Sequence, residues 1–125
     1  MLKPQRPVHL NLFTIKFPIT AIVSILHRLS GCFLFAVIPV FLGLWQLSLK
    51  SAIEFEKVKV WLQHPVSQSL RFLVLFALFY HMAAGIRHLI MDTGRGESLW
   101  AARLSAYAVL GIALLLTTGV YLCSR

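Results

Sequence analysis

The sequence predicts an all-α integral membrane protein, a bundle of three transmembrane helices, and three observations support this fold class. Of its 125 residues, 58% are hydrophobic and only 13% are charged, about half the charged share of a typical soluble domain. The mean hydropathy is +0.79. Three segments are long and apolar enough to cross a bilayer, which takes about 20 residues in a helix. We predict spans at residues 21–49, 66–92 and 104–124, within a single membrane domain of residues 1–125.

The first predicted span, residues 21–49, begins with two ionisable side chains. A helix of about 20 residues that ends at Leu49 begins near Ser30, so His27 and Arg28 would lie at one membrane interface instead of in the hydrocarbon. No uninterrupted apolar core or cleavage site precedes this span, so we expect it to be retained rather than removed as a signal peptide. The N-terminal residues also lack the arginine and serine pattern of a transit peptide, which favours a bacterial inner membrane.

The other two spans differ in their charge. The second, residues 66–92, is interrupted by arginines and histidines, whereas the third, residues 104–124, contains no charge. The connector KSAIEFEKVKVWLQHP mixes charges of both signs with a tryptophan and a His-Pro turn, which is typical of a short amphipathic segment on the membrane surface. The connector DTGRGES contains two glycines, which indicate a tight turn between helices.

The net charge of +8 does not indicate a nucleic-acid partner, because the basic residues are scattered at segment ends instead of forming a stripe. A lipid bilayer with anionic headgroups accounts for them better. The N-terminal side of the bundle carries slightly more lysine and arginine, which favours a cytoplasmic N-terminus. Cys32 and Cys123 lack CxxC or CxxCH spacing, so we expect small buried hydrophobic side chains, not zinc ligands or a c-type haem attachment.

Two of the predicted spans carry a polar face, because residues at i, i+3, i+4 and i+7 lie on one side of a helix. On the first span this face consists of Ser24, His27, Arg28 and Gly31. On the second span it consists of His81, Ala84, Gly85 and His88, with Asp92 one turn later. These spans run antiparallel, so the start of the first meets the end of the second at one membrane surface. We therefore expect a polar collar there, formed by Ser24, His27, Arg28, Arg87, His88 and Asp92.

His81 is predicted to lie deeper in the membrane than this collar. It precedes His88 by two helical turns, which is about 10.5 Å along the helix axis. An ionisable group at that depth is costly, and it is a functional hypothesis by default. A neutral imidazole that ligates a metal avoids the charge, and the small residues Ala84 and Gly85 would leave room for a flat macrocycle. The pattern therefore predicts a haem whose iron is held by His81.

The two propionates of a haem favour a basic, polar edge near the membrane interface. The available donors are His27, Arg28 and His88, with Arg87 as a weaker candidate on the neighbouring face. Only His81 lies at ligand depth, so a six-coordinate haem would take its second ligand from a partner membrane subunit.

Structural explanations of the same residues stay open. His81 could hydrogen-bond a neighbouring helix, and Arg28 could extend to lipid phosphates. Ala84 and Gly85 could form an ordinary close contact between helices.

The stretches RPVHLNL, FPITAIVSILHRLSG and HMAAGIRHLIMD closely resemble the two signature regions of the cytochrome b556 subunits of succinate dehydrogenase, the larger membrane anchors of complex II. The motifs S-x-x-H-R-x-S-G and H-x-x-x-G-I-R-H-x-x-x-D are highly specific, and the three stretches together reach from Arg6 to Asp92. The third span agrees with the three-helix layout of this family. Residues 50–65 match no signature, and no position with a chemical role departs from the family pattern.

The resemblance implies that two hydrophobic anchors hold one haem b between them, with His81 as the axial iron ligand from this subunit. The smaller anchor would supply the other histidine. Ser24 and Arg28 would help bind ubiquinone near the cytoplasmic surface, close to an iron-sulfur subunit, beyond which a flavoprotein subunit oxidises succinate. His27, Arg28 and His88 would lie near the haem propionates. This chain would then serve electron transport and the tricarboxylic acid cycle without catalytic residues of its own.

Quinone chemistry supports these implied roles. A quinone carbonyl becomes more basic as electrons arrive, so a hydroxyl donor such as Ser24 and a cation such as Arg28 would stabilise the developing charge and help to deliver protons. Asp92 could keep Arg28 or a histidine oriented, or it could belong to a proton path.

Two other functions fit parts of the sequence. One is a haem-free anchor that only fixes its partners in the membrane. The other is a b-type subunit of a fumarate reductase with two haems, which needs four histidines at two depths. Because only His81 is deep, the second alternative is disfavoured.

Overall fold

The computed structural model describes residues 16–124, and these residues form four helices. In chain order the helices are α1 (Ile19–Ser48), α2 (Ala52–Gln63), α3 (Pro65–Asp92) and α4 (Leu99–Cys123). Three of them, α1, α3 and α4, are long and apolar enough to cross a membrane. The predicted fold class is therefore confirmed, and the chain is a multi-pass membrane protein. The motif RPVHLNL, residues 6–12, lies outside the described residues.

The predicted boundaries agree with the structure except at the start of the third span. There the helix begins at Leu99, five residues before the predicted start at Leu104. The side chain of Ser98 accepts a hydrogen bond from the Ala101 backbone nitrogen and so caps the helix. Arg103 is exposed, so its charge does not end the helix. A charge therefore indicates where a helix leaves the hydrocarbon, whereas a capping residue indicates where it begins.

The connector between the first two spans forms the short helix α2. Its apolar side chains do not gather on one face, so the predicted amphipathic character is not confirmed, and its place at the membrane surface stays a prediction. Ser51 accepts a hydrogen bond from the Glu54 backbone nitrogen at its start. Pro65 then occupies the first turn of α3, where its missing N–H costs nothing. The predicted turn between α3 and α4 is also confirmed: Gly94 and Gly96 both have φ of 77°, a conformation that favours glycine.

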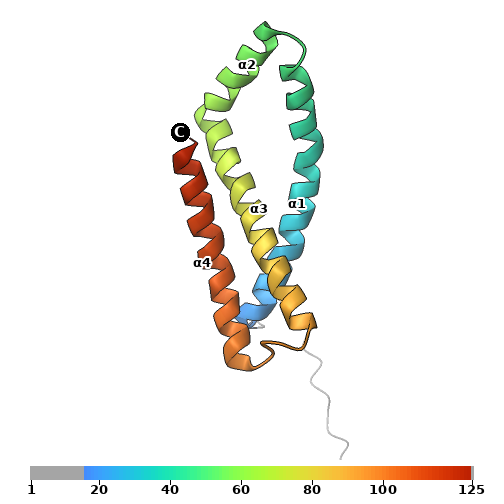
Figure 1. Cartoon of the computed structure of the whole chain (residues 1–125), viewed down its shortest axis with the longest axis vertical. Coiled ribbons are helices and arrows are strands. Elements are labelled where there is room, and N and C mark those ends of the chain that lie inside the picture. Colours follow the sequence, from blue (N-terminus) through green and yellow to red (C-terminus); the bar gives the residue numbers. More distant parts are fainter. Residues whose placement is uncertain (1–15, 125) are drawn as a thin grey trace, which may run out of the picture.

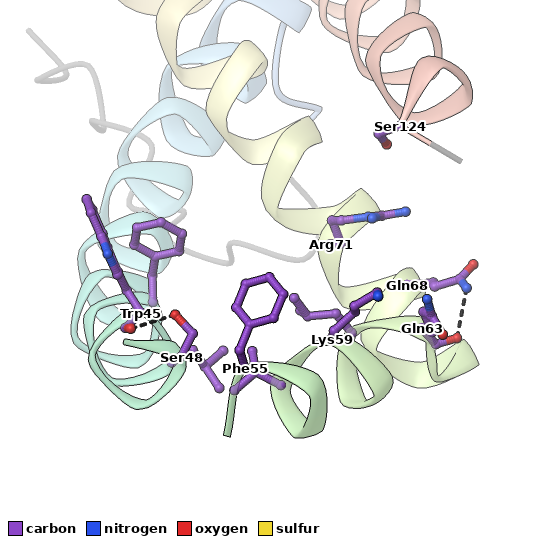
Figure 2. Close-up of a pocket in the computed structure, with 12 residues that line it drawn as sticks. Trp45, Ser48, Phe55, Lys59, Gln63, Gln68, Arg71 and Ser124 are labelled. Atoms are coloured by element: carbon purple, nitrogen blue, oxygen red, sulfur yellow. Dashed lines mark hydrogen bonds between the residues drawn. The ribbon is translucent and has the colours of Figure 1, made fainter. Parts of the chain in front are cut away.

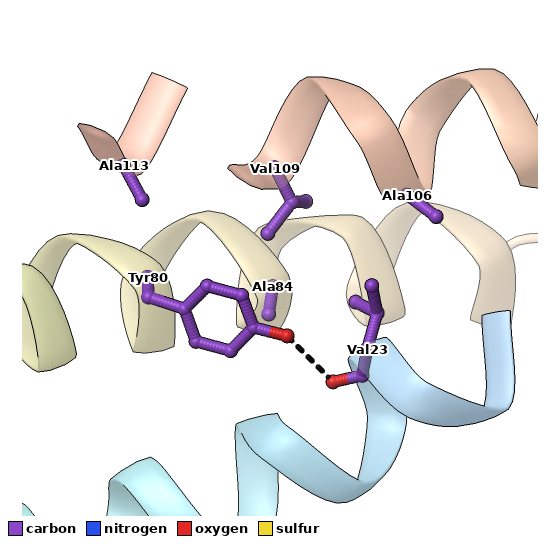
Figure 3. Packing of buried hydrophobic residues seen from close by; sticks show 6 residues of the cluster. All are labelled: Val23, Tyr80, Ala84, Ala106, Val109 and Ala113. Carbon is purple, nitrogen blue, oxygen red and sulfur yellow. Dashed lines mark hydrogen bonds between the residues drawn. The ribbon is translucent and has the colours of Figure 1, made fainter. Parts of the chain in front are cut away.

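Helix α3 lies between α1 and α4 (Figure 3). Small side chains one turn apart on α4 face the bundle, so the helix backbones approach closely. The buried cluster consists of Val23, Tyr80, Ala84, Ala106, Val109 and Ala113. The hydroxyl of Tyr80 donates to the backbone oxygen of Val23 at 2.9 Å and ties α3 to α1. Away from this cluster, α1 and α3 separate, and α2 connects them at the far end (Figure 1).

Most apolar side chains of this chain are exposed rather than packed inside it. In the most apolar 18-residue stretch of α1, only 6% of the residues are buried, compared with 17% in that of α3 and 22% in that of α4. Cys32 and Cys123 are exposed too, so the prediction that they are buried is wrong. Both lie on helix surfaces that three helices are too few to cover.

Candidate functional site

Three histidines from α1 and α3 come together near the start of α1. The ring of His27 stacks on the ring of His81, with centroids 4.3 Å apart and planes 19° apart. The ring of His88 lies 5.2 Å from that of His27 at 44°. His27 therefore bridges the two histidines of α3. The prediction that only His81 lies at ligand depth is wrong, because the ring of His27 reaches it.

Each stacked histidine lies against a glycine of the opposite helix. A Cβ atom at Gly31 of α1 would lie 2.9 Å from Cε1 of His81, which is closer than Cβ atoms approach other heavy atoms in proteins. A Cβ atom at Gly85 of α3 would lie 3.4 Å from Nε2 of His27, which is a tight contact. Gly31 was predicted only as a member of the polar face. In the structure it makes the space in which the His81 imidazole lies.

The Nδ1 atom of His81 is held by α1. It lies 3.1 Å from the backbone oxygen of His27 and 3.1 Å from Oγ of Ser30. The Ser30 hydroxyl itself donates to the same His27 oxygen at 2.8 Å. A backbone oxygen can only accept, so the network assigns the proton to Nδ1 of His81. The lone pair of Nε2 is then available to an electrophile or a metal.

This arrangement fits a histidine that would ligate a haem iron. The lone pair of Nε2 lies in the plane of the imidazole ring, so a ring stacked on its face does not cover it. A hydrogen bond from the other ring nitrogen to a backbone oxygen is the usual support of a metal-binding histidine. Among residues 16–124, no three histidine, cysteine, aspartate or glutamate side chains converge as ligands of a single ion.

The other predicted site residues lie near the histidines without contacting them. Ser24 is half-buried on α1, one turn before His27, while Arg28 and Asp92 are exposed. Within the described part of the chain, none of the three forms a side-chain hydrogen bond or ion pair. Asp92 therefore does not orient Arg28 or a histidine by direct contact within residues 16–124.

Arg87 does not join the predicted collar. It is buried, with 6% of its surface exposed, and it is directed to α4. There its Nε donates to Oγ of Ser105 at 3.0 Å, and its Nη2 donates to the backbone oxygen of Ala102 at 3.3 Å. The predictions that Arg87 belongs to the collar and could face a propionate are therefore wrong. Arg87 lies on the α4 side of α3, while the histidines lie on the α1 side.

Ala84 also serves a different purpose from the predicted one. It has no exposed surface and packs in the cluster shared with α1 and α4. The prediction that it leaves room for a macrocycle is wrong, and the alternative of a close helix contact is right. Gly85, its neighbour, makes room for the ring of His27.

The sequence did not predict one residue of the site, Ser30, or the interhelical hydrogen bond of Tyr80 in the packing cluster. Ser30 follows His27 by one helical turn, and its hydroxyl is a polar group at the start of an apolar run, which is the signal that could have found it. Tyr80 had no comparable signal. Its partner is a backbone oxygen of another helix, and no spacing within one helix indicates such a contact.

The profile of the family described as "Succinate dehydrogenase/Fumarate reductase transmembrane subunit" matches residues 3–120. The chain is similar to a succinate dehydrogenase cytochrome b556 subunit of Coxiella burnetii, with 42% identity over 84% of this chain and 85% of that protein. A protein of the same description from Rickettsia bellii is 33% identical over 90% of this chain and 88% of its own length.

The likeness extends to mitochondria. A mitochondrial succinate dehydrogenase cytochrome b560 subunit of Mus musculus is 34% identical over 93% of this chain and 70% of its own length. The profile match and these three relatives, together with the three apolar helices, agree. The chain belongs to the family of transmembrane subunits of succinate dehydrogenase and fumarate reductase.

Proposed function

We propose that this chain is the haem b-binding membrane anchor of a succinate:ubiquinone oxidoreductase. The observation that carries the proposal is the state of His81, whose Nδ1 is held by the His27 backbone oxygen and Ser30 while Nε2 is left with its lone pair. The names of its relatives, which are cytochrome b subunits, support the choice of haem b. When bound, the haem supplies a one-electron redox centre within the membrane.

In this proposal His81 would hold the haem iron, and the chain's own residues prepare it for that role. The backbone oxygen of His27 fixes the tautomer, and Gly31 leaves space for the ring. The side chains proposed to face the propionates are His27, Arg28 and His88. Their position supports this, because His27 and Arg28 lie toward the start of α1 and His88 toward the end of α3, on the side of the turn that joins α3 to α4.

Ser24 and Arg28 are proposed to bind ubiquinone at the same end. The Ser24 hydroxyl would donate to a quinone oxygen, and the Arg28 cation would stabilise the negative charge that develops there. The quinone takes up two electrons and two protons, which balances the two electrons released when a partner subunit oxidises succinate to fumarate. Asp92, exposed at the end of α3, remains a predicted member of a proton path.

The proposed partners are a smaller hydrophobic anchor, an iron-sulfur subunit and a flavoprotein subunit. The exposed apolar surface of α1 supports a second membrane subunit, which would supply the other iron ligand. The iron-sulfur subunit would dock at the histidine end, beside the quinone. We propose a bacterial inner membrane with the N-terminus in the cytoplasm. That orientation places the histidine end of the bundle on the cytoplasmic side.

The haem role is tested by spectroscopy of the purified complex. We expect reduced-minus-oxidised spectra of the wild-type complex to show a b-type signal, and His81→Ala to abolish it. Met82→Ala, an exposed neighbour on the same helix, is the matched control and should keep the signal. Absence of a b-type signal in the wild type would favour the haem-free anchor, and an unchanged signal in His81→Ala would remove His81 as the ligand.

The quinone role is tested by comparing two activities of the same complex. Ser24→Ala and Arg28→Leu should each slow quinone reduction by about tenfold or more, because a hydrogen bond to a charged group contributes about 1.5–3 kcal/mol. Succinate oxidation with an artificial dye as acceptor should not change, because that reaction takes place on a partner subunit. Normal quinone reduction in both variants would refute the assignment.

A further inference from the structure

A second site lies at the end of the bundle opposite to the histidines. There α1, α2 and the start of α3 enclose a pocket of about 550 Å³, and Ser124 at the end of α4 completes its lining (Figure 2). A pocket of this size is within the range of small-molecule sites, which is about 300–1,000 Å³. The function proposed above makes no use of it.

The lining of this pocket is divided into an apolar side and a polar side. Trp45 and Phe55 form the apolar side, while Lys59, Gln68 and Arg71 gather on the other (Figure 2). None of the described residues that line the pocket is acidic. Such a division suits a ligand with an anionic polar end and an apolar body.

Arg71 is the centre of the polar side. Its guanidinium carbon lies 5.2 Å from the centroid of the Tyr121 ring, so an aromatic face from α4 holds the cation in place. Its Nε is buried and makes no hydrogen bond within residues 16–124. The Arg71 guanidinium has no acidic partner among these residues, and an anionic oxygen in the pocket would supply one.

Lys59 adds a second positive charge that is available to a ligand. Its Nζ lies 3.3 Å from Oε2 of Glu56, but both side chains are more than half exposed. An exposed pair of this kind contributes little stability, about 0–1 kcal/mol. An anion in the pocket can therefore compete with Glu56 for Lys59.

The depth of the pocket identifies the kind of anion. Arg71 follows Pro65 by six residues, which is about 9 Å along α3. The bilayer with its headgroups is about 40–45 Å thick and its hydrocarbon about 30 Å, so α3, with its 28 residues, would place Arg71 near the boundary between the two if it spans the bilayer from end to end. At that depth, the anions that also carry an apolar body are the phospholipids of the membrane.

We infer that this pocket binds the headgroup of an anionic phospholipid. The phosphate accepts hydrogen bonds from Arg71 and Lys59, and the first methylene groups of the acyl chains lie against Trp45 and Phe55. The remainder of the chains leaves the pocket along the exposed apolar surface of α1. The lipid joins α1, α2 and α3 where they separate, so it stabilises the end of the bundle that the protein packs least closely.

The experiment measures lipid binding by the whole purified complex. After lipid is removed in a neutral detergent, the complex is titrated with phosphatidylglycerol, phosphatidylcholine or inorganic phosphate. Binding is followed by native mass spectrometry and by the midpoint of thermal denaturation. We expect phosphatidylglycerol to bind and to raise the midpoint, whereas phosphatidylcholine and inorganic phosphate do so at least about tenfold more weakly. Equal effects of phosphatidylcholine or of phosphate alone would overturn the inference.

Two pairs of variants assign the site. Arg71→Gln should weaken phosphatidylglycerol binding by about tenfold, whereas Arg103→Gln, an exposed arginine at the other end of the bundle, should not. Lys59→Gln should weaken binding less, and Lys57→Gln, which lies on α2 outside the pocket, should have no effect. If Arg71→Gln fails to assemble, the pair on α2 decides. Wild-type affinity in the assembled pocket variants, or no binding by the wild-type complex because another subunit fills the pocket, would overturn the inference.

Discussion

The two sides of α3 use ionisable side chains in opposite ways. On the side that faces α4, Arg87 is buried and donates hydrogen bonds to Ser105 and to the Ala102 backbone. On the side that faces α1, His81 has one ring nitrogen held, and the other makes no hydrogen bond within residues 16–124. An ionisable residue in a membrane helix is therefore not a functional group by itself. What separates the two is whether an atom capable of chemistry is left without a partner.

The largest effect is expected from overfilling the packed cluster on the α4 side. Ala84→Leu adds bulk at a position with no exposed surface, and we expect it to destabilise the assembled complex by about 1–3 kcal/mol. Thermal denaturation of the purified complex measures this change. Ala36→Leu, at an exposed position on α1, should leave the midpoint unchanged. Equal stability of both variants would contradict the packing described here.

An intermediate effect is expected on the α1 side, where function and not stability should respond. Gly31→Ala places a Cβ atom 2.9 Å from Cε1 of His81 and should displace the ring from its hydrogen bonds. We expect haem occupancy to fall by about tenfold, the effect of losing about 1.4 kcal/mol.

The matched control is Gly43→Ala, on the same helix with nothing within 4 Å of the new Cβ. Both variants should assemble, and only Gly31→Ala should have an altered b-type spectrum. Identical spectra from the two variants would show that the close approach of Gly31 does not position the ligand.

The smallest effect is expected from Arg87→Met, which keeps an unbranched apolar stem and removes the hydrogen bonds to α4. Interhelical hydrogen bonds in membranes contribute about 0.6 kcal/mol each, so stability should fall by about 1 kcal/mol. The haem spectrum and the rate of quinone reduction should not change. An altered spectrum would place Arg87 with the histidines and remove the distinction between the two sides of α3.

Much of the fold could be predicted from the sequence because its signals are local. Apolar length gave the three spans, and the glycines of DTGRGES gave the turn at Gly94 and Gly96. Helical spacing placed His27 on the polar face of the first span and His81 and His88 on that of the second. In the structure the ring of His27 lies against the rings of both other histidines.

The rest depends on how α3 is rotated between its two neighbours, and a single helix does not encode that rotation. Arg87 and His88 are adjacent in sequence, yet one turns to α4 and the other to α1. Ala84 and Gly85 are also adjacent, yet Ala84 packs in the cluster shared with α1 and α4, whereas Gly85 lies against the ring of His27. The prediction that His27 lies at a shallower depth than His81 was wrong for a related reason. Counting residues along one helix gives the depth of a backbone atom, but it does not give the position that a side chain of another helix reaches.

The paired contacts of Gly31 with His81 and of Gly85 with His27 also fix how α1 and α3 can slide past each other. A shift of α1 by one turn, about 5.4 Å, would put His27, Arg28, Leu34 or Phe35 where Gly31 now lies. None of these side chains leaves space for an imidazole ring. His81 therefore fits in only one register of the two helices. The residue proposed to hold the iron also fixes the position of α1 along α3.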